Sequence, residues 1–149
     1  MSALHDQLRA DLQDAMRSRD VLRRETIRFL EAAIQNAEIE RRGPLDDTDI
    51  VTLIQKQVRQ REESVAQFRA GARADLADKE EAEIAVLQAY LPQQMSRAAI
   101  QAAAQAVIAR TGASGRADKG KVMGPLMAEL RGRADGRLIN EIVQELLGD

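Results

Sequence analysis

Apolar residues recur every three or four positions along most of this chain, which is the spacing that places them on one face of an α-helix. In residues 1–91 this spacing predicts four helices, separated by turns at Ser18-Arg19-Asp20, at Arg41-Arg42-Gly43-Pro44 and near Gly71. The residues predicted to face inward are Leu4, Leu8, Leu12 and Ala15, then Ile27, Leu30, Ile34 and Ala37, then Ile50, Ile54, Val58, Val65 and Phe68, and finally Leu76, Ile84, Leu87 and Leu91. No run of four to eight residues alternates between apolar and polar, so the pattern predicts no strand.

The pattern breaks at Pro92 and then predicts three more helices. A proline disfavours helical backbone in the residue before it, so a helix should end at Leu91, and Ser96 is the expected N-cap of the next one. The inward-facing residues of these helices are Ile100, Ala103, Ala104 and Val107, then Met123, Leu126, Met127 and Leu130, and finally Ile139, Ile142, Val143 and Leu146. We therefore predict an all-α protein, with a helical N-terminal domain of about four helices over residues 1–92 and a three-helix bundle over residues 96–149.

The composition agrees with a helical fold and excludes several kinds of site. Ala, Leu, Glu, Gln and Arg dominate, and these are strong helix formers. The chain has no Cys, no Trp and one His, which excludes a thiol nucleophile, a disulfide framework, an iron–sulfur cluster and a zinc ribbon. His5 has no second His with which to share a metal, and we expect it to face solvent near a frayed terminus. We predict no catalytic residue, no metal and no cofactor.

The sequence shows no signal for a membrane or for export. No stretch approaches the roughly 18 consecutive apolar residues of a membrane span. The N-terminal residues show no basic region followed by an apolar run, as a secretory signal would. A cytoplasmic protein with no membrane partner is the resulting expectation.

Charge is divided unevenly along the chain. The net charge of −2 arises from 14 basic and 18 acidic side chains in residues 1–91 and from 8 basic and 6 acidic side chains in residues 92–149. Residues 110–137 alone carry seven basic and three acidic side chains. The basic half of the molecule is therefore the part in which we look for an anionic ligand.

A short repeat lies inside this basic segment. Gly115-Arg116-Ala117-Asp118 recurs as Gly132-Arg133-Ala134-Asp135, and each copy stands just before a predicted helix. One interpretation is structural: each Asp is an N-cap, and each Gly allows a tight turn. The other is a phosphate site, because cations beside the positive N-terminus of a helix repel it unless an anion is bound there.

Two other kinds of functional site are less favoured by the sequence. The first copy fits the G-x-x-x-x-G-K spacing of a nucleotide-binding loop, but Val122 stands where a hydroxyl must hold magnesium. General acid/base pairs in the acidic runs Glu62-Glu63 and Glu80-Glu81-Glu83 are the second, but adjacent positions on a helix diverge in direction, so we interpret these runs as solvated helix faces. Met123 and Met127 are interpreted as core residues.

The few aromatic residues limit how a nucleic acid could bind. Phe29 and Phe68 are assigned to apolar faces and Tyr90 to the domain boundary, which leaves no stacking platform for unpaired bases. Contacts would then be made to the backbone and shape of the nucleic acid through Arg, Lys and helix ends. A folded RNA suits this mode better than a single strand.

Two blocks of sequence resemble the GatB/YqeY family. Gly120-Lys121-Val122-Met123-Gly124 and the run from Arg131 to Asn140 are similar to the tail domain of the B subunit of the glutamine-dependent tRNA amidotransferase. Upstream residues resemble the free-standing YqeY-like members, namely Arg61, Gln67-Phe68, Arg73, Asp75-Leu76, Lys79-Glu80 and Leu87-Gln88-Ala89-Tyr90-Leu91-Pro92. The resemblance covers essentially the whole chain and implies the same two-domain helical fold.

The resemblance also implies a function and a site. In the full amidotransferase the tail contacts tRNA, while the glutaminase and the amidating site lie in parts that are absent here. Matching the motif implies an RNA-binding set made of Arg116, Lys119, Gly120, Lys121, Arg131, Gly132, Arg133, Asp135, Gly136 and Arg137. Two features depart from expectation: Ala72 stands where the family places Gly before the Arg matching Arg73, and Pro125 falls inside the sixth helix.

Three functional hypotheses follow. The leading one is a non-catalytic module that binds tRNA or another structured RNA, with the amidotransferase or the tRNA-synthesis machinery as a possible associate. The second is a protein-interaction adaptor that engages its partner through the N-terminal domain. The third, implied by the resemblance, is an accessory to carbon–nitrogen ligase activity with glutamine as amide donor.

Overall fold

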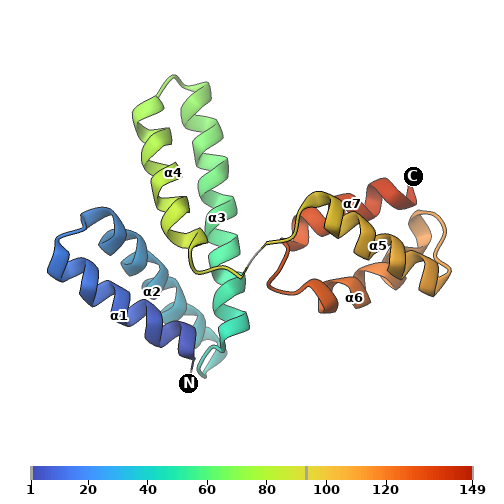
Figure 1. The fold of residues 1–149 in the computed structure, drawn as a ribbon, viewed down its shortest axis with the longest axis horizontal. Coiled ribbons are helices and arrows are strands. Elements are labelled where there is room, and N and C mark those ends of the chain that lie inside the picture. The colour runs from blue at the N-terminus through green and yellow to red at the C-terminus, as the bar shows by residue number, and fades with distance from the viewer. Residues whose placement is uncertain (1, 93, 149) are drawn as a thin grey trace. The chain divides into compact units, whose positions relative to one another are not determined.

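The computed structural model describes residues 2–92 and 94–148 and consists of helices throughout these ranges (Figure 1). Seven α-helices and one 3-10 turn are found there, and no strand, so the predicted all-α fold is confirmed. The described chain forms two compact units, Met1–Leu91 and Pro92–Asp149. Gln93, which stands between the two predicted domains, lies outside the described residues.

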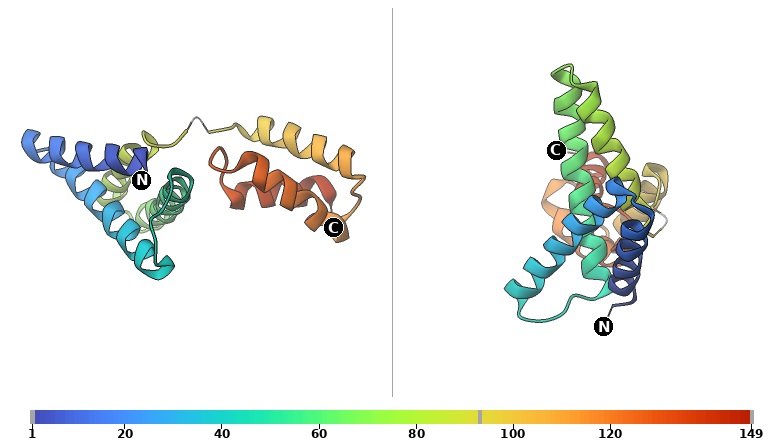
Figure 2. Two further views of the ribbon diagram at one scale, coloured as in Figure 1. Left: turned by 90° about the horizontal axis from the view of Figure 1, so that it is seen from below. Right: turned by 90° about the vertical axis from the view of Figure 1, so that its left-hand side faces the viewer.

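The N-terminal unit is built from four helices: α1 (Ala3–Ser18), α2 (Val21–Arg41), α3 (Asp47–Ala70) and α4 (Ala74–Gln88). Figures 1 and 2 show α3 and α4 lying side by side as an antiparallel hairpin. The apolar faces predicted from the sequence meet in one core, whose fully buried members are Leu8, Ile27, Leu30, Ile34, Ile50, Ile54 and Leu87. Burial of each such side chain contributes about 1.5–3 kcal/mol to folding.

Polar side chains fix where α1, α2 and α3 begin. The hydroxyl of Ser2 accepts the N–H of His5 at 3.0 Å, and the carboxylate of Asp20 accepts the N–H of Arg23 at 3.2 Å. Asp46 and Asp49 form a reciprocal capping box at the start of α3, in which each side chain accepts the other's backbone N–H. Such caps satisfy the backbone donors that the first turn leaves without a partner.

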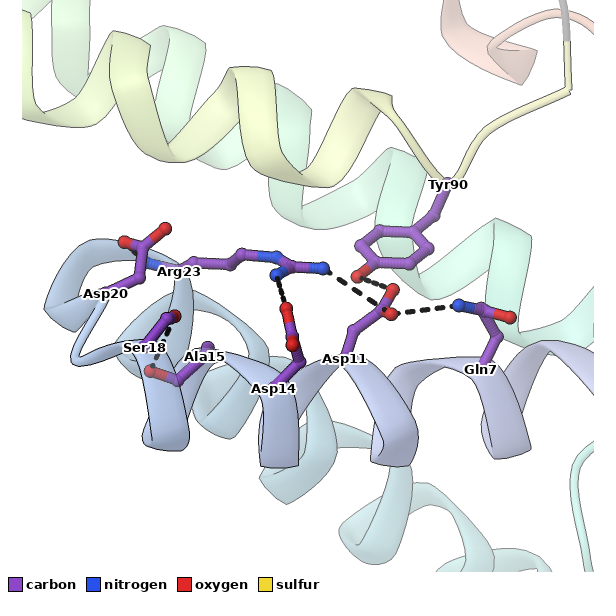
Figure 3. A network of polar contacts seen from close by, with 8 residues as sticks. All are labelled: Gln7, Asp11, Asp14, Ala15, Ser18, Asp20, Arg23 and Tyr90. Atoms are coloured by element: carbon purple, nitrogen blue, oxygen red, sulfur yellow. Dashed lines mark hydrogen bonds and ion pairs between the residues drawn. The ribbon is translucent and has the colours of Figure 1, made fainter.

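The end of α4 is tied to α1 by a polar network (Figure 3). The hydroxyl of Tyr90 donates a 2.5 Å hydrogen bond to Asp11. The guanidinium of Arg23 lies 3.4 Å from the same carboxylate and 3.0 Å from Asp14, and the amide of Gln7 donates to Asp11 at 2.8 Å. Burial, followed by the bond to Asp11, raises the pKa of Tyr90 to about 12. Tyr90 therefore fixes the last residues before Pro92 to the first helix of the unit.

The C-terminal unit contains α5 (Arg97–Thr111), the 3-10 turn η1 (Arg116–Asp118), α6 (Lys119–Leu130) and α7 (Gly136–Leu147). Its core is separate from that of the first unit, and the fully buried members are Ile100, Ala104, Val107, Val122, Leu126, Ile142 and Val143. Ser96 caps α5 by accepting the N–H of Ala99 at 3.1 Å, as the sequence predicts. Pro125 lies in the interior of α6. It removes a backbone donor, so the Lys121 carbonyl one turn earlier loses its helical partner.

Two sequence expectations about buried and exposed residues are wrong. His5 is only 6% exposed, because Ser2 orders the start of α1 and the imidazole Nε2 lies 3.0 Å from a carboxylate oxygen of Glu31. Phe29 is 60% exposed, because it stands one residue before Leu30 and therefore points about 100° around the helix from the buried stripe. Its ring is covered on one side by the guanidinium of Arg61, at 5.4 Å from the centroid.

Two further assignments are corrected in part. Met127 is 39% exposed and rests its side chain against Gly136, where an added Cβ would lie 2.9 Å from the methionine methyl. Glu62, Glu63 and Glu81 are exposed as predicted, but Glu83 is buried in an ion pair with Arg61. No helix among the described residues has the length and apolar character needed to span a membrane.

Candidate nucleic-acid interface

The first basic cluster, formed by Arg116, Lys119 and Lys121, surrounds the start of α6. Gly115 adopts a positive φ of 75°, which turns the chain out of the preceding loop into η1. Asp118 stands at the N-cap position, but its carboxylate accepts the N–H of Ser114 at 2.9 Å and lies 3.2 Å from the ammonium of Lys121. These two contacts, in that order, lower the pKa of Asp118. The predicted capping of α6 by Asp118 is therefore wrong, because the side chain stabilises the loop instead.

The first turn of α6 consequently has no side-chain cap. Gly120 lies within this turn, where the absence of a side chain leaves open space beside the backbone. Arg116 is exposed and Lys119 is half-buried, and neither forms an ion pair with any residue that the structure describes. Backbone donors without a side-chain partner and two cations without a carboxylate together form an electropositive start of helix.

The second basic cluster, formed by Arg131, Arg133 and Arg137, lies between α6 and α7. Gly132 adopts a positive φ of 80°, so both glycines of the repeat provide the turn that the sequence predicts. Asp135 caps α7 by accepting the N–H of Arg137 at 2.9 Å, as predicted for this copy. Its role as a cap keeps the carboxylate at the helix start, so this cluster contains one fixed negative charge.

Backbone hydrogen bonds hold the second cluster in place. The carbonyl of Arg133 accepts the N–H of Met95 at 2.9 Å, and the carbonyl of Gly132 accepts the side-chain amide of Gln94 at 3.1 Å. The Arg133 side chain is exposed and has no ion-pair partner in the described part of the chain. Gly136 opens α7. The turn is thus fixed through its backbone, which leaves the Arg133 guanidinium available to solvent.

The structure places the two clusters at opposite ends of α6. The helix has 12 residues, so at a rise of 1.5 Å per residue its ends lie about 18 Å apart. Residues 110–137 form one continuous basic segment in the sequence, but the residues predicted to bind RNA do not form a single pocket. Each Gly-Arg-Ala-Asp copy instead serves a different end of the same helix.

One cation of this region is missing from the sequence-predicted set. Arg110 is exposed in the last turn of α5, and it forms no ion pair with a described residue. A cation in a last turn stabilises the helix through its negative C-terminal end. The sequence therefore offers no signal that distinguishes helix stabilisation from ligand binding at this position. Arg110 stands in the sequence just before the loop that leads to η1.

Several arginines of the N-terminal unit are held by carboxylates. Arg23, Arg61 and Arg69 each contact two carboxylates, and Arg73 forms a two-pronged contact with Asp75. The carboxylates around them neutralise these cations. Among the described residues, Arg116, Lys119 and Arg133 have no such ion pair, and the same is true of the exposed Arg9, Arg19 and Arg42 of the N-terminal unit. Within residues 2–92 and 94–148, no three His, Asp or Glu side chains are grouped so that they could hold a metal ion.

Relatives of this chain occur in fungi under the name "Altered inheritance of mitochondria protein 41, mitochondrial". The one from Pyrenophora tritici-repentis is 34% identical over 144 residues, which is 95% of this chain and 79% of the relative. The relatives from Lachancea thermotolerans and Saccharomyces cerevisiae are 40% and 33% identical over 87 residues each. In these two, the match spans 58% of this chain and somewhat less than half of the relative, 46% and 47%.

These names overturn one expectation from the sequence. The predicted cytoplasmic location is contradicted, because the relatives are named as mitochondrial proteins. The error came from treating the absence of a secretory signal as evidence for the cytoplasm.

The family match extends over nearly the whole chain. Residues 5–147 match the family described as Yqey-like protein, and this range includes all seven helices apart from the first residues of α1. Both basic clusters and the N-terminal unit fall inside the matched range. The chain therefore belongs to the YqeY-like family.

Proposed function

We propose that this chain is a non-catalytic module that binds a folded RNA, of which tRNA is the leading candidate, through the two basic clusters of its C-terminal unit. The observation that carries the proposal is the set of cations without carboxylate partners at the two ends of α6. Arg116 and Lys119 flank an uncapped helix start, and Arg133 projects from a turn fixed by its backbone. Phosphate is the anion that suits both environments.

The spacing of the clusters favours a polyanion over a small phosphorylated ligand. A single phosphate group cannot reach both ends of a helix about 18 Å long. A folded RNA presents many phosphates on a rigid surface, and it can contact both clusters at once. The resemblance of residues 120–124 and 131–140 to a tRNA-contacting tail domain supports the same class of ligand.

The proposal needs no chemistry from this chain. An association with the amidotransferase, or an accessory role in amide formation with glutamine as donor, would place the reaction on other chains. The RNA-binding role proposed here stands whether or not such an association exists.

Binding of tRNA by matched triple variants tests the proposal. In the first variant, Arg116, Lys119 and Arg133 are changed to Gln, which keeps a polar side chain at each position and removes three charges. In the control, the exposed Arg9, Arg19 and Arg42 of the N-terminal unit are changed to Gln in the same way. The first variant should lose about tenfold or more in affinity, at roughly 1 kcal/mol or less per lost phosphate contact, and the control should change little. Equal losses in both variants, or in neither, would show that the clusters are not the RNA-binding surface.

A further inference from the structure

Helix α2 exposes large apolar side chains along the edge of the N-terminal unit (Figure 2). Ile39 is 74% exposed, Phe29 is 60% exposed and Val21 is 56% exposed. They are three of the five large apolar side chains that are exposed in the described part of the chain. Single exposed apolar residues are common on protein surfaces, whereas several on one element mark an interaction site.

The exposed positions of α2 form a single continuous face. All nine exposed residues from Val21 to Glu40 fall within an arc of about 140° when each residue is turned 100° from the last. Phe29, Ala32 and Ile39 lie on this face, and the buried residues of α2 lie on the opposite side of the helix. The face is therefore wide enough to accept a second helix.

The ring of Phe29 is held in a fixed position on this face. The guanidinium of Arg61 lies over it, 5.4 Å from the ring centroid, in a cation–π contact. Glu80 and Glu83 fix the guanidinium in turn. A side chain that is already ordered loses little conformational entropy when a partner covers it, so Phe29 is suited to anchor an interface.

The apolar residues of this face match one another when two copies of α2 are placed antiparallel. In an interface with two-fold symmetry, residue i of one molecule contacts residue j of the other, and j contacts i. If the symmetry axis passes beside position 34, Phe29 of each copy lies opposite Ile39 of the other. The small Ala32 stands next to this axis, where it lets the two helices approach closely.

The charges of the face agree with the same pairing. Arg28 and Glu40 lie equally far from position 34 on either side, so Arg28 of one copy stands opposite Glu40 of the other. Glu40 is exposed and forms no ion pair with a described residue.

Arg28 is only weakly held within its own chain. It lies 3.7 Å from Glu25, one turn earlier, and the two side chains are 48% and 56% exposed. An exposed pair of this kind contributes little stability. Glu25 also has a closer partner in Arg24, at 3.0 Å, so it stays neutralised when Arg28 turns to a second molecule.

We propose that this face of α2 binds a second copy of this chain through antiparallel pairing of the two α2 helices. The pairing overlaps residues 27–41 of each copy, a length of about 22 Å. A single helix pair of this length buries less than the roughly 1,200 Å² of a stable interface, so the dimer should be weak, with a Kd of about 10–100 μM. The inference is independent of RNA binding, because α2 belongs to the other unit.

Sedimentation equilibrium of the RNA-free full chain tests this proposal. The average mass should rise from that of one chain at about 1 μM toward that of two chains at about 500 μM. Ile39→Ala should weaken dimerisation by about tenfold or more, because each dimer loses both isoleucine contacts. Val21→Ala is the matched control. Val21 is exposed on the same face but lies beyond the overlap, so its variant should dimerise as the natural chain does.

Charge reversal tests which residues face each other. Arg28→Glu places two anions opposite each other, and Glu40→Arg places two cations opposite each other, so each variant alone should dimerise roughly tenfold more weakly. An equal mixture of the two variants should form a mixed dimer about as strong as the natural one, because both facing pairs are then opposite in sign. Positions 28 and 40 of one helix lie about 18 Å apart, so recovery on mixing must come from contact between molecules.

Three results would overturn the proposal. One is a natural chain that remains monomeric at about 500 μM, which would leave the face to a different protein. Another is a dimer that Ile39→Ala does not weaken, because the contact would then lie on another surface. The third is a mixture of the charge variants that dimerises no better than either variant alone.

Discussion

In the turn between α3 and α4, the glycine stands one residue before the position that needs a left-handed backbone. The N–H of Arg73 bonds to the carbonyl of Phe68 at 2.8 Å, which is the outer bond of a Schellman motif. This motif needs a left-handed residue just beyond the end of the helix, and Ala72 takes that conformation with φ 58°. Gly71, which could adopt it without strain, has φ −88°. We therefore expect that exchanging the two residues, by Gly71→Ala together with Ala72→Gly, stabilises the N-terminal unit.

The size of the effect follows from the backbone. A non-glycine residue in the left-handed region costs about 1–2 kcal/mol. The exchange leaves the composition unchanged, so the flexibility of the unfolded chain nearly cancels. A Cβ added at Gly71 would meet the carbonyl oxygen of Gln67 at 3.5 Å, an ordinary contact. The exchange should therefore raise the free energy of unfolding by about 1–2 kcal/mol.

Urea unfolding followed by circular dichroism measures this change. The midpoint should rise while the dependence on urea concentration stays the same, because the surface exposed on unfolding is unchanged. Ala74→Gly, in the first turn of α4, is the control, and it should lower stability by up to about 1 kcal/mol. A double variant no more stable than the natural sequence would refute the account of this turn.

Three further predictions concern single side chains. The pKa of Tyr90 is raised to about 12 from an ordinary value of 10, so the neutral hydroxyl adds stability that is full below pH 10 and lost between pH 10 and 12. Because the ring is half-exposed, solvent screening reduces this contribution to about 1 kcal/mol, and Tyr90→Phe should remove the loss of melting temperature over that interval. Asp135→Ala should destabilise the C-terminal unit by about 1 kcal/mol in thermal unfolding, because it removes the cap of α7. Asp118→Ala should strengthen tRNA binding in a titration, because it releases Lys121 from its ion pair; weaker binding would contradict the assignment of the first basic cluster.

Helix positions could be predicted from the sequence because they depend on local signals. The spacing of Leu8, Ile27 and Ile100 with their neighbours marks the buried faces, and all three are fully buried. Caps such as Asp46 and Ser96 act within four residues of their own position. Local chemistry of this kind is readable from a single chain.

Residues whose environment is set by another helix could not be predicted in the same way. His5 is buried because its imidazole Nε2 lies 3.0 Å from a carboxylate oxygen of Glu31, which stands 26 residues away. Arg61 joins Phe29, Glu80 and Glu83 across three helices. Sequence spacing carries no information on which helix faces pack together, so these contacts became visible only in the structure.

The candidate RNA-binding residues illustrate a different limit. The sequence identifies the basic clusters and the repeat that contains Arg116 and Arg133, but proximity along the chain suggested a single surface. The helix between the copies separates them by about 18 Å. The two repeat aspartates also differ in role. Asp118 accepts a hydrogen bond from the loop residue Ser114, whereas Asp135 caps α7.

The dependence of tRNA affinity on salt concentration tests the central claim most directly. A surface that neutralises three or four phosphates should give a linear plot of log affinity against log salt with a slope of about −2 to −4. The slope should become shallower by about 1 for each charge removed from Arg116, Lys119 or Arg133. An affinity that does not change with salt, or the absence of tRNA binding at low ionic strength, would contradict the account.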